Sequence, residues 1–269
     1  MTLIASWVGV DCRKQGLVPA SIYIVSDSRI SWPDGSYSDN HVKVFACKKH
    51  PDIFGYCGDV LFPSNFIHQF TNMADEGFLF SETANHTEKN ALLVEQFKSS
   101  IAKYPADKLS EGIKILHAGR DPDNTFHCSA MSYSFATGIS IERKTMPAIS
   151  DLIDVSGSGK TFFAQNYYER KHGGHNTFGT SRGIYHCFTD TLEQAKDIKC
   201  GGAPQMAGLY WRGNGMYFGI LQDGKRYYMG NEINSVQMPN FVEWRNESFE
   251  RIHPKESRLL DKAQRQPKQ

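Results

Sequence analysis

The sequence has no excess of one charge and no long apolar run. Its 269 residues hold 30 Lys and Arg against 29 Asp and Glu, a formal net charge of +1. The isoelectric point of about 7.7 lies below the value of roughly 9 above which a domain's charge indicates nucleic-acid binding. No window approaches the roughly 18 uninterrupted apolar residues of a membrane-spanning helix. We therefore expect neither nucleic acid nor a membrane as a partner, and enzymes and interaction modules remain.

Closely spaced cysteines are also lacking. None of the six lies in a CxxC pair, which argues against a zinc site, and a disulfide framework is typical of much shorter secreted chains. The first seven residues show neither the basic start nor the apolar stretch of a signal peptide. We expect reduced thiols, no metal, no cofactor and a cytoplasmic location. The cysteines are Cys12, Cys47, Cys57, Cys128, Cys187 and Cys200.

Hydrophobic periodicity predicts strands, two helices, strands, two helices and further strands. We expect an α+β fold in which two sheets pack together with helices on the outer faces, a four-layer αββα sandwich. One domain would cover residues 1–230, and a C-terminal extension, 231–269, would be helical or partly disordered. The strands are expected at 3–11, 20–30, 41–50, 52–58, 112–118, 125–133, 139–143, 151–155, 205–211, 216–221 and 226–229, and the helices at 62–76, 88–103, 160–171 and 181–196.

A glycine-rich string runs from Ser156 to Thr161, between a predicted strand and a predicted helix. It resembles a phosphate-binding P-loop, whose backbone N–H groups surround phosphates. That motif needs a glycine at position 154, where this chain has Asp154. A nucleotide-binding protein is therefore one alternative, and a tight turn from strand to helix is the simpler one.

Thr2 provides a second candidate centre. Removal of Met1 would leave a residue with both a hydroxyl and an α-amine. An amine with a pKa of about 8 can accept the hydroxyl proton near neutral pH, and threonine activated by its own amine is a known type of nucleophile.

Five short motifs occur in an order that resembles the proteasome β-subunit family, including its bacterial two-component relative, among the N-terminal-nucleophile hydrolases. The resemblance covers Thr2 to about Gly230. The motifs after the N-terminal threonine are Asp27-Ser28-Arg29, Lys43-Val44-Phe45, Gly55-Tyr56-Cys57-Gly58-Asp59, Gly157-Ser158-Gly159 and Asp197-Ile198-Lys199-Cys200-Gly201-Gly202.

The resemblance implies a role for each of these residues. Lys43 would lie beside Thr2, where its charge would favour the alkoxide, and Asp27 would hold Lys43. The backbone N–H of Gly55 would meet the oxyanion. Ser158 and Asp197 would form hydrogen bonds around the α-amine.

The chain departs from the family pattern at several places. Cys200 replaces the usual serine, and a thiol is a weaker donor than a hydroxyl. A polar insertion at 12–19 and the long C-terminal extension make ring assembly and partner docking less certain than the chemistry. The resemblance also places four residues around the first substrate pocket, with an apolar lining suited to uncharged side chains: Ile30, Ser31, Ile53 and Cys57.

The sequence thus predicts a threonine-type hydrolase that cleaves peptide or amide bonds through an acyl-enzyme on Thr2. The resemblance implies a homo-oligomeric ring, fed with peptide or protein substrate by a separate ATP-dependent unfoldase. Three alternatives remain open. They are an amidohydrolase of the same fold acting on a small molecule, a nucleotide-binding protein, and a catalytically silent scaffold subunit that retains Met1.

Overall fold

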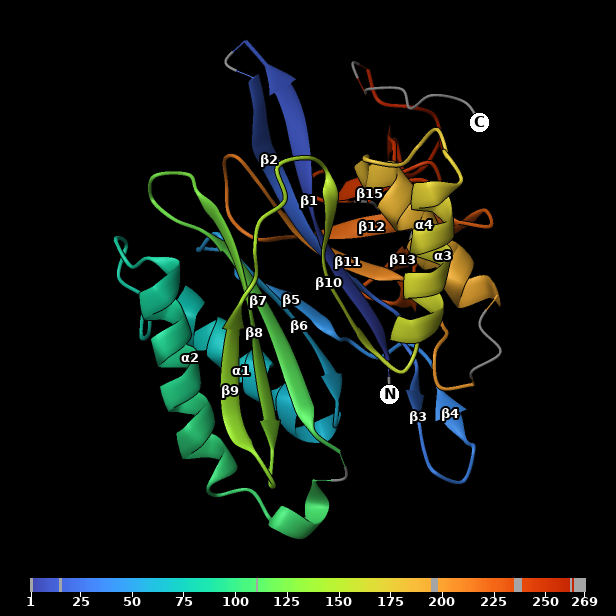
Figure 1. The fold of residues 1–269 in the computed structure, drawn as a ribbon. Coiled ribbons are helices and arrows are strands. Elements are labelled where there is room, and N and C mark those ends of the chain that lie inside the picture. Colours follow the sequence, from blue (N-terminus) through green and yellow to red (C-terminus); the bar gives the residue numbers. More distant parts are fainter. Residues whose placement is uncertain are drawn as a thin grey trace.

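The computed structural model describes residues 2–14, 16–109, 111–194, 198–234, 239–261 and 263. Within these ranges the chain forms four α-helices and two large sheets (Figure 1). The predicted α+β class is confirmed.

The larger sheet has nine strands. Its main path runs β10-β1-β2-β11-β12-β13-β14, and β15 and β16 join through β12. The strands are β1 (Leu3–Arg13), β2 (Gly16–Ser26), β10 (Asp151–Gly157), β11 (Gln205–Tyr210), β12 (Met216–Gln222), β13 (Lys225–Tyr228), β14 (Asn231–Glu232), β15 (Glu243–Arg245) and β16 (Arg251–Ile252).

The smaller sheet has five strands in the order β5-β6-β7-β8-β9. They are β5 (Val44–Ala46), β6 (Asp52–Gly58), β7 (Ile113–Arg120), β8 (Phe126–Ser134) and β9 (Gly138–Arg143). A separate two-stranded hairpin, β3 (Ile30–Ser31) and β4 (Tyr37–Ser38), lies near the start of β1 (Figure 1).

Two pairs of helices cover the sheets. In Figure 1, α1 (Leu61–Asp75) and α2 (His86–Ile101) lie on the five-stranded sheet, and α3 (Lys160–His172) and α4 (Ser181–Gln194) lie on the nine-stranded sheet. A capping box between Asn85 and Glu88 starts α2, two residues before the predicted start. That cap fixes the position of His86, the first residue of the helix.

The buried apolar residues form three cores. One lies under α3 and α4, one lies between the sheets, and one lies under α1 and α2. Successive residues of β1 alternate between two of these cores, because Leu3 and Trp7 belong to the first core and Ile4 to the second. Both faces of β1 are therefore buried, as expected of a strand between two layers.

The C-terminal extension differs from the prediction. Within its described residues, 231–234, 239–261 and 263, it forms the short strands β14, β15 and β16, and β15 pairs in parallel with β12. Trp244 and Phe249 are 2% and 3% exposed, respectively. A Cβ at Gly219 would lie 2.3 Å from the Trp244 indole, so this glycine makes room for the ring. Burial of two aromatic side chains holds the segment on the sheet and disfavours a surface helix.

All six cysteines lie among the described residues and are free thiols, with Cys12 exposed and the other five buried. No helix in the described part of the chain is long and apolar enough to cross a membrane.

Candidate functional site

Thr2, Asp27 and Lys43 come together at the start of β1, and we call them the Lys43 group. The Lys43 Nζ donates to Thr2 Oγ1 at 2.9 Å and to Asp27 Oδ1 at 2.9 Å. Its third acceptor is the carbonyl oxygen of Arg29. Because an ammonium has three N–H donors, the head group of Lys43 is fully satisfied, and one of its donors is aimed at the Thr2 oxygen.

Neighbouring backbone fixes Asp27, the residue that follows β2. Its Oδ1 accepts from the Leu3 N–H at 3.1 Å, and its Oδ2 accepts from the Gly201 N–H at 3.1 Å. The Asp27 N–H in turn donates to the Leu3 carbonyl oxygen at 3.2 Å. The carboxylate is therefore held by the first residues of β1 and by the loop before β11, and it orients Lys43.

The Lys43–Asp27 ion pair has no solvent exposure on either side chain. Burial raises the pKa of Asp27, while Lys43 and the N–H groups of Gly201 and Leu3 act in the opposite direction. A buried ion pair needs both partners and good hydrogen bonds to be stable. Lys43 and Asp27 meet both requirements. The charge of Lys43 lies beside the hydroxyl oxygen of Thr2, and this charge would stabilise the alkoxide form of the hydroxyl.

Gln205, the first residue of β11, links the segment that contains Asp27 to the segment that contains Lys43. Its Nε2 donates to the carbonyl oxygens of Asp27 at 3.0 Å and His41 at 2.7 Å, and its Oε1 accepts from the Lys43 N–H at 2.9 Å. The residue has no solvent exposure. Sequence reasoning missed it, although an amide at the head of an apolar strand is the kind of buried polar residue that needs an explanation.

Ser158 and Cys200 lie together, since Ser158 Oγ is 3.3 Å from Cys200 Sγ. The pairing of Leu3 with Gly157 brings this turn alongside the start of β1. The Gly159 N–H points at the Thr2 carbonyl oxygen at 3.5 Å. Asp197, which was predicted to act here, lies outside the described residues.

Gly55 does not suit the predicted oxyanion role. Tyr56 N–H donates to the Lys43 carbonyl oxygen, and backbone groups alternate sides along an antiparallel strand. The Gly55 N–H therefore points away from β5 towards β7, where Leu116 is its partner in the register. A Cβ at Gly55 would lie 2.6 Å from Ile4 and 2.8 Å from Ile24. The glycine allows the two sheets to approach each other, and its N–H belongs to the ladder.

The four residues predicted around a substrate pocket are separated. Ile53 and Cys57 belong to the apolar core between the sheets, and burial raises the pKa of the Cys57 thiol to about 11. Ile30 instead lines a cavity of about 900 Å³ beside α1. Ser31, the next residue, has a buried hydroxyl for which the described residues offer no hydrogen-bond partner. A single apolar pocket formed by all four is therefore not what the structure shows.

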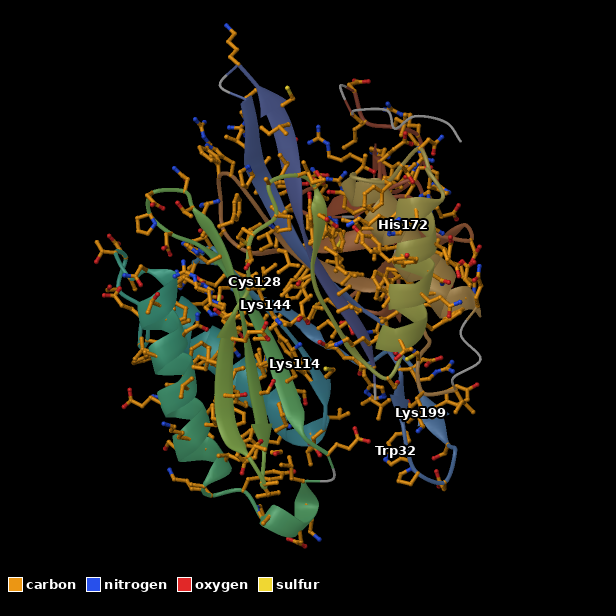
Figure 2. All side chains as sticks on the ribbon, viewed as in Figure 1. Trp32, Lys114, Cys128, Lys144, His172 and Lys199 are labelled. Atoms are coloured by element: carbon orange, nitrogen blue, oxygen red, sulfur yellow. The ribbon has the colours of Figure 1, made fainter. Side chains whose placement is uncertain are left out.

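A second group of lysine, hydroxyl and carboxylate bridges the two sheets, and we call Lys114, Asp154 and Ser156 the Lys114 group. Lys114 Nζ donates to Asp154 Oδ2 at 2.9 Å and to Ser156 Oγ at 2.6 Å, and Ser156 Oγ donates to Asp154 Oδ2 at 2.7 Å. Lys144 adds a second ion pair to Asp154 at 2.8 Å. Figure 2 labels both lysines, which come from the side of the five-stranded sheet.

The same contacts argue against a P-loop. Asp154 and Ser156 bind lysines, and Gly157 pairs with Leu3 in the β1–β10 ladder. A Cβ at Gly157 would lie 1.8 Å from the Thr2 carbonyl oxygen. Because the loop packs against β1, its backbone does not form an open cradle for phosphates. The string from Ser156 to Thr161 is a strand end and the start of α3.

Access to the Lys43 group is restricted. Thr2 is 1% exposed, and it does not line the cavity that Ile30 borders. The described arrangement thus has the contacts of an activated hydroxyl without an open approach to it.

These features define an α+β protein with a buried polar centre where its two sheets meet. No protein-family model matches the sequence, and no curated protein matches it. Among solved structures, the fold is similar to that of Anbu (ancestral beta-subunit) from Yersinia bercovieri. The TM-score is 0.53 at 11% sequence identity, over 80% of this chain and 86% of that chain.

The assignment to the proteasome β-subunit family and its bacterial two-component relative is wrong as a sequence assignment. No family model matches the chain, and the likeness to Anbu, at 11% identity, is one of fold alone. The five motifs are short and rich in glycine, serine and aspartate, residues that turns and strand ends require in many folds. The order of such motifs does not establish a family.

Proposed function

We propose that this protein is a threonine-type hydrolase that cleaves peptide or amide bonds through an acyl-enzyme on Thr2. The observation that carries the proposal is the 2.9 Å contact between Lys43 Nζ and Thr2 Oγ1. A hydroxyl is a weak nucleophile until a base takes its proton and a positive charge stabilises its oxygen. The Lys43 group supplies the charge, and an α-amine on Thr2 would supply the base.

The proposed reaction has two stages. The α-amine of Thr2 takes the hydroxyl proton while Oγ1 attacks the substrate carbonyl carbon, with Lys43 beside the oxygen. The carbon–nitrogen bond of the substrate then breaks, the leaving amine takes the proton, and an ester on Thr2 remains. Water hydrolyses this ester and restores the hydroxyl.

The proposal requires cleavage of the peptide bond before Thr2. Only then does residue 2 carry a free amine, and the same cleavage must open a path to Oγ1, which belongs to a residue that is 1% exposed. Ser158 and Cys200 would lie near the new amine, because their turn packs against Thr2.

We infer further that the sheets and helices form a four-layer αββα sandwich and that copies of the chain assemble into a closed oligomer. The likeness of fold to an ancestral beta-subunit supports both inferences. A separate unfoldase that delivers protein substrates belongs to the same proposal.

A catalytically silent scaffold subunit is the second candidate. The burial of Thr2 favours it, because a subunit that keeps the residue before Thr2 would have neither a free amine nor an open approach. Its Lys43 group would then serve only to join the two sheets.

Intact mass and hydrolysis of fluorogenic peptides and simple amides test the proposal. We expect the purified chain to begin at Thr2 and to hydrolyse at least one substrate class. Thr2→Ala should abolish turnover, and the matched variant Ser156→Ala should keep it to within about threefold, because Ser156 carries no amine. Retention of Met1 without turnover, or turnover unchanged in Thr2→Ala, would contradict the proposal.

A further inference from the structure

Three side chains of the kinds that bind metals converge under the first turn of α2. They are Asp52 on β6, His117 on β7 and His86 at the start of α2. One potential ligand atom of each lies within 4.8 Å of those of the other two, and all three residues are buried. Imidazole nitrogens together with a carboxylate oxygen form a typical donor set for zinc.

Gly119 leaves the space that these atoms face. A Cβ at this position would lie 2.7 Å from Asp52 Oδ1, 2.9 Å from His86 Nδ1 and 3.6 Å from His117 Nε2. The φ angle of Gly119 is not positive, so backbone conformation does not require glycine there. The need is for room beside the three polar atoms.

His86 has an unused nitrogen aimed at this space. Its Nε2 contacts Ser129 Oγ at 3.1 Å, whereas its Nδ1 is buried and has no hydrogen-bond partner among the described residues. The residue is 3% exposed, so bulk solvent does not reach this nitrogen. A buried polar atom without a partner has a cost of about 1–3 kcal/mol, and coordination to a cation would remove that cost.

His117 is oriented by Asn90. The Asn90 amide nitrogen donates to the His86 carbonyl oxygen at 3.0 Å and to Ser129 Oγ at 3.3 Å. Its Oδ1 therefore faces His117 Nδ1, at 3.1 Å, and accepts the proton there. This leaves His117 Nε2 pointing at Asp52 Oδ1, 2.8 Å away. Hydrogen bonding of the far nitrogen to an amide or carboxylate is the usual support of a metal-binding histidine.

One carboxylate oxygen of Asp52 is also placed to bind a metal ion. Lys89 on α2 binds its Oδ2 at 2.6 Å, while Oδ1 lies with the two histidines. An ion at this place would replace the hydrogen bond that now joins His117 Nε2 to Asp52 Oδ1.

We propose that Asp52 Oδ1, His86 Nδ1 and His117 Nε2 bind a divalent transition-metal ion of the zinc type. The ion would tie the first turn of α2 to β6 and β7, with Asn90, Ser129 and Lys89 orienting the ligands. Its role is structural, because the site is closed to solvent and contains none of the residues of the Lys43 group.

Titration of the full chain, treated with a chelator and dialysed, with Co²⁺ and with Zn²⁺ tests this site. We expect one Co²⁺ per chain with the visible absorption of a low-coordinate site, and one Zn²⁺ per chain by calorimetry. Zn²⁺ should also raise the melting temperature of the wild-type protein. Failure of the wild-type chain to bind either ion at micromolar concentration would overturn the proposal.

Two variants and a control locate the ion. His86→Gln removes a ligand and Gly119→Ala fills the space, so each should weaken binding by about 100-fold or more and lose the Zn²⁺-dependent rise in melting temperature. His127→Gln is the control, because His127 stacks on His86 with ring centroids 5.5 Å apart and is not a proposed ligand. It should bind within about threefold of wild type. Unchanged binding in both His86→Gln and Gly119→Ala would contradict the assignment.

Discussion

The Lys43 group and the Lys114 group contain the same three kinds of side chain in different settings. In each, a lysine from the side of the five-stranded sheet binds a carboxylate and a hydroxyl from the side of the nine-stranded sheet. The Ser156 hydroxyl donates its proton to Asp154. The Thr2 hydroxyl accepts from Lys43, and none of the described residues accepts the proton of this hydroxyl.

The two carboxylates also differ in their electrostatic environment. For Asp27, burial prevails and raises the pKa, although Lys43 opposes it. For Asp154, burial acts in the same direction, but hydrogen bonds from Lys144, Ser156 and Lys114 outweigh it and lower the pKa. Asp154 thus has an excess of donors, and its group serves as a link between sheets. Among the described residues, Asp27 has one cationic partner, Lys43, which also donates to the hydroxyl of Thr2 at the start of β1.

Replacing Lys43 and Lys114 one at a time should give the largest difference between the Lys43 group and the Lys114 group. Lys43→Met should lower turnover by about 10²–10⁴-fold, because the charge beside the Thr2 oxygen is lost. It should also cost about 3–5 kcal/mol of folding free energy, since Asp27 would remain buried without its cation. Steady-state kinetics and denaturant unfolding measure the two effects.

Two further variants distinguish a loss of stability from a loss of catalysis in Lys43→Met. The double variant Asp27→Asn with Lys43→Met should regain most of the stability without the activity. Lys114→Met should retain turnover to within about threefold and lose about 1 kcal/mol or less, because Lys144 still binds Asp154. Equal losses of turnover in Lys43→Met and Lys114→Met would show that the first group has no special role.

Gln205→Leu should give a smaller effect on the same centre. The buried Lys43 N–H and the Asp27 carbonyl oxygen would lose their partner, which costs about 1–3 kcal/mol. We expect turnover to fall about tenfold, with most of the change in kcat, since Gln205 positions Lys43 without touching Thr2. Gln205→Glu keeps the acceptor but sets a carboxylate oxygen against the carbonyl oxygens of Asp27 and His41, so it should lose at least as much turnover as Gln205→Leu. Wild-type turnover in Gln205→Leu would contradict a positioning role.

Asp154 should contribute to stability in a defined pH range. Hydrogen bonds from lysines and Ser156 hold its pKa in the folded chain below the ordinary value of 3.8. Its contribution is therefore present above about pH 4 and is lost as the pH falls through the folded-state pKa. The difference in free energy of unfolding between wild type and Asp154→Asn should be constant from pH 7 to 5 and shrink below pH 4. A difference that grows on acidification would reverse the assigned sign.

Cys200→Ser should have the smallest effect. A hydroxyl is a better donor to Ser158 than a thiol is. A gain of about 0.5–1 kcal/mol in hydrogen bonding corresponds to a rise of about two- to fivefold in turnover. Steady-state kinetics of Cys200→Ser measure this change in turnover. Cys187→Ser is the control, because Cys187 lies in the core under α3 and α4. A fall in turnover in Cys200→Ser would count against a supporting role for residue 200.

Much of the fold follows from local pattern. The alternation in residues 3–11 predicts a strand with two distinct faces, and the structure places those two faces in separate cores. The helix stripe at Ile184, Cys187 and Phe188 predicts α4, which packs on that sheet through the same residues. Strand β15 could not be predicted, because its place depends on a distant glycine, Gly219, that accommodates Trp244.

The candidate site is less accessible to sequence reasoning. Thr2, Asp27 and Lys43 were grouped through a resemblance that does not hold as a family assignment, and the structure nevertheless brings their side chains into contact. Gln205 was missed because it reaches two loops that are distant in the chain. The Asp52, His86 and His117 cluster comes from three separate elements, so no spacing rule predicts it.

The most direct test of the central claim is mass spectrometry after treatment with a peptide epoxyketone, which reacts with a hydroxyl and an amine on the same residue. We predict a single adduct on a chain that begins at Thr2, strongly slowed in Lys43→Met and unaffected in Lys114→Met. A chain that begins at Thr2 and forms no adduct, or that forms one on another residue, would contradict the account.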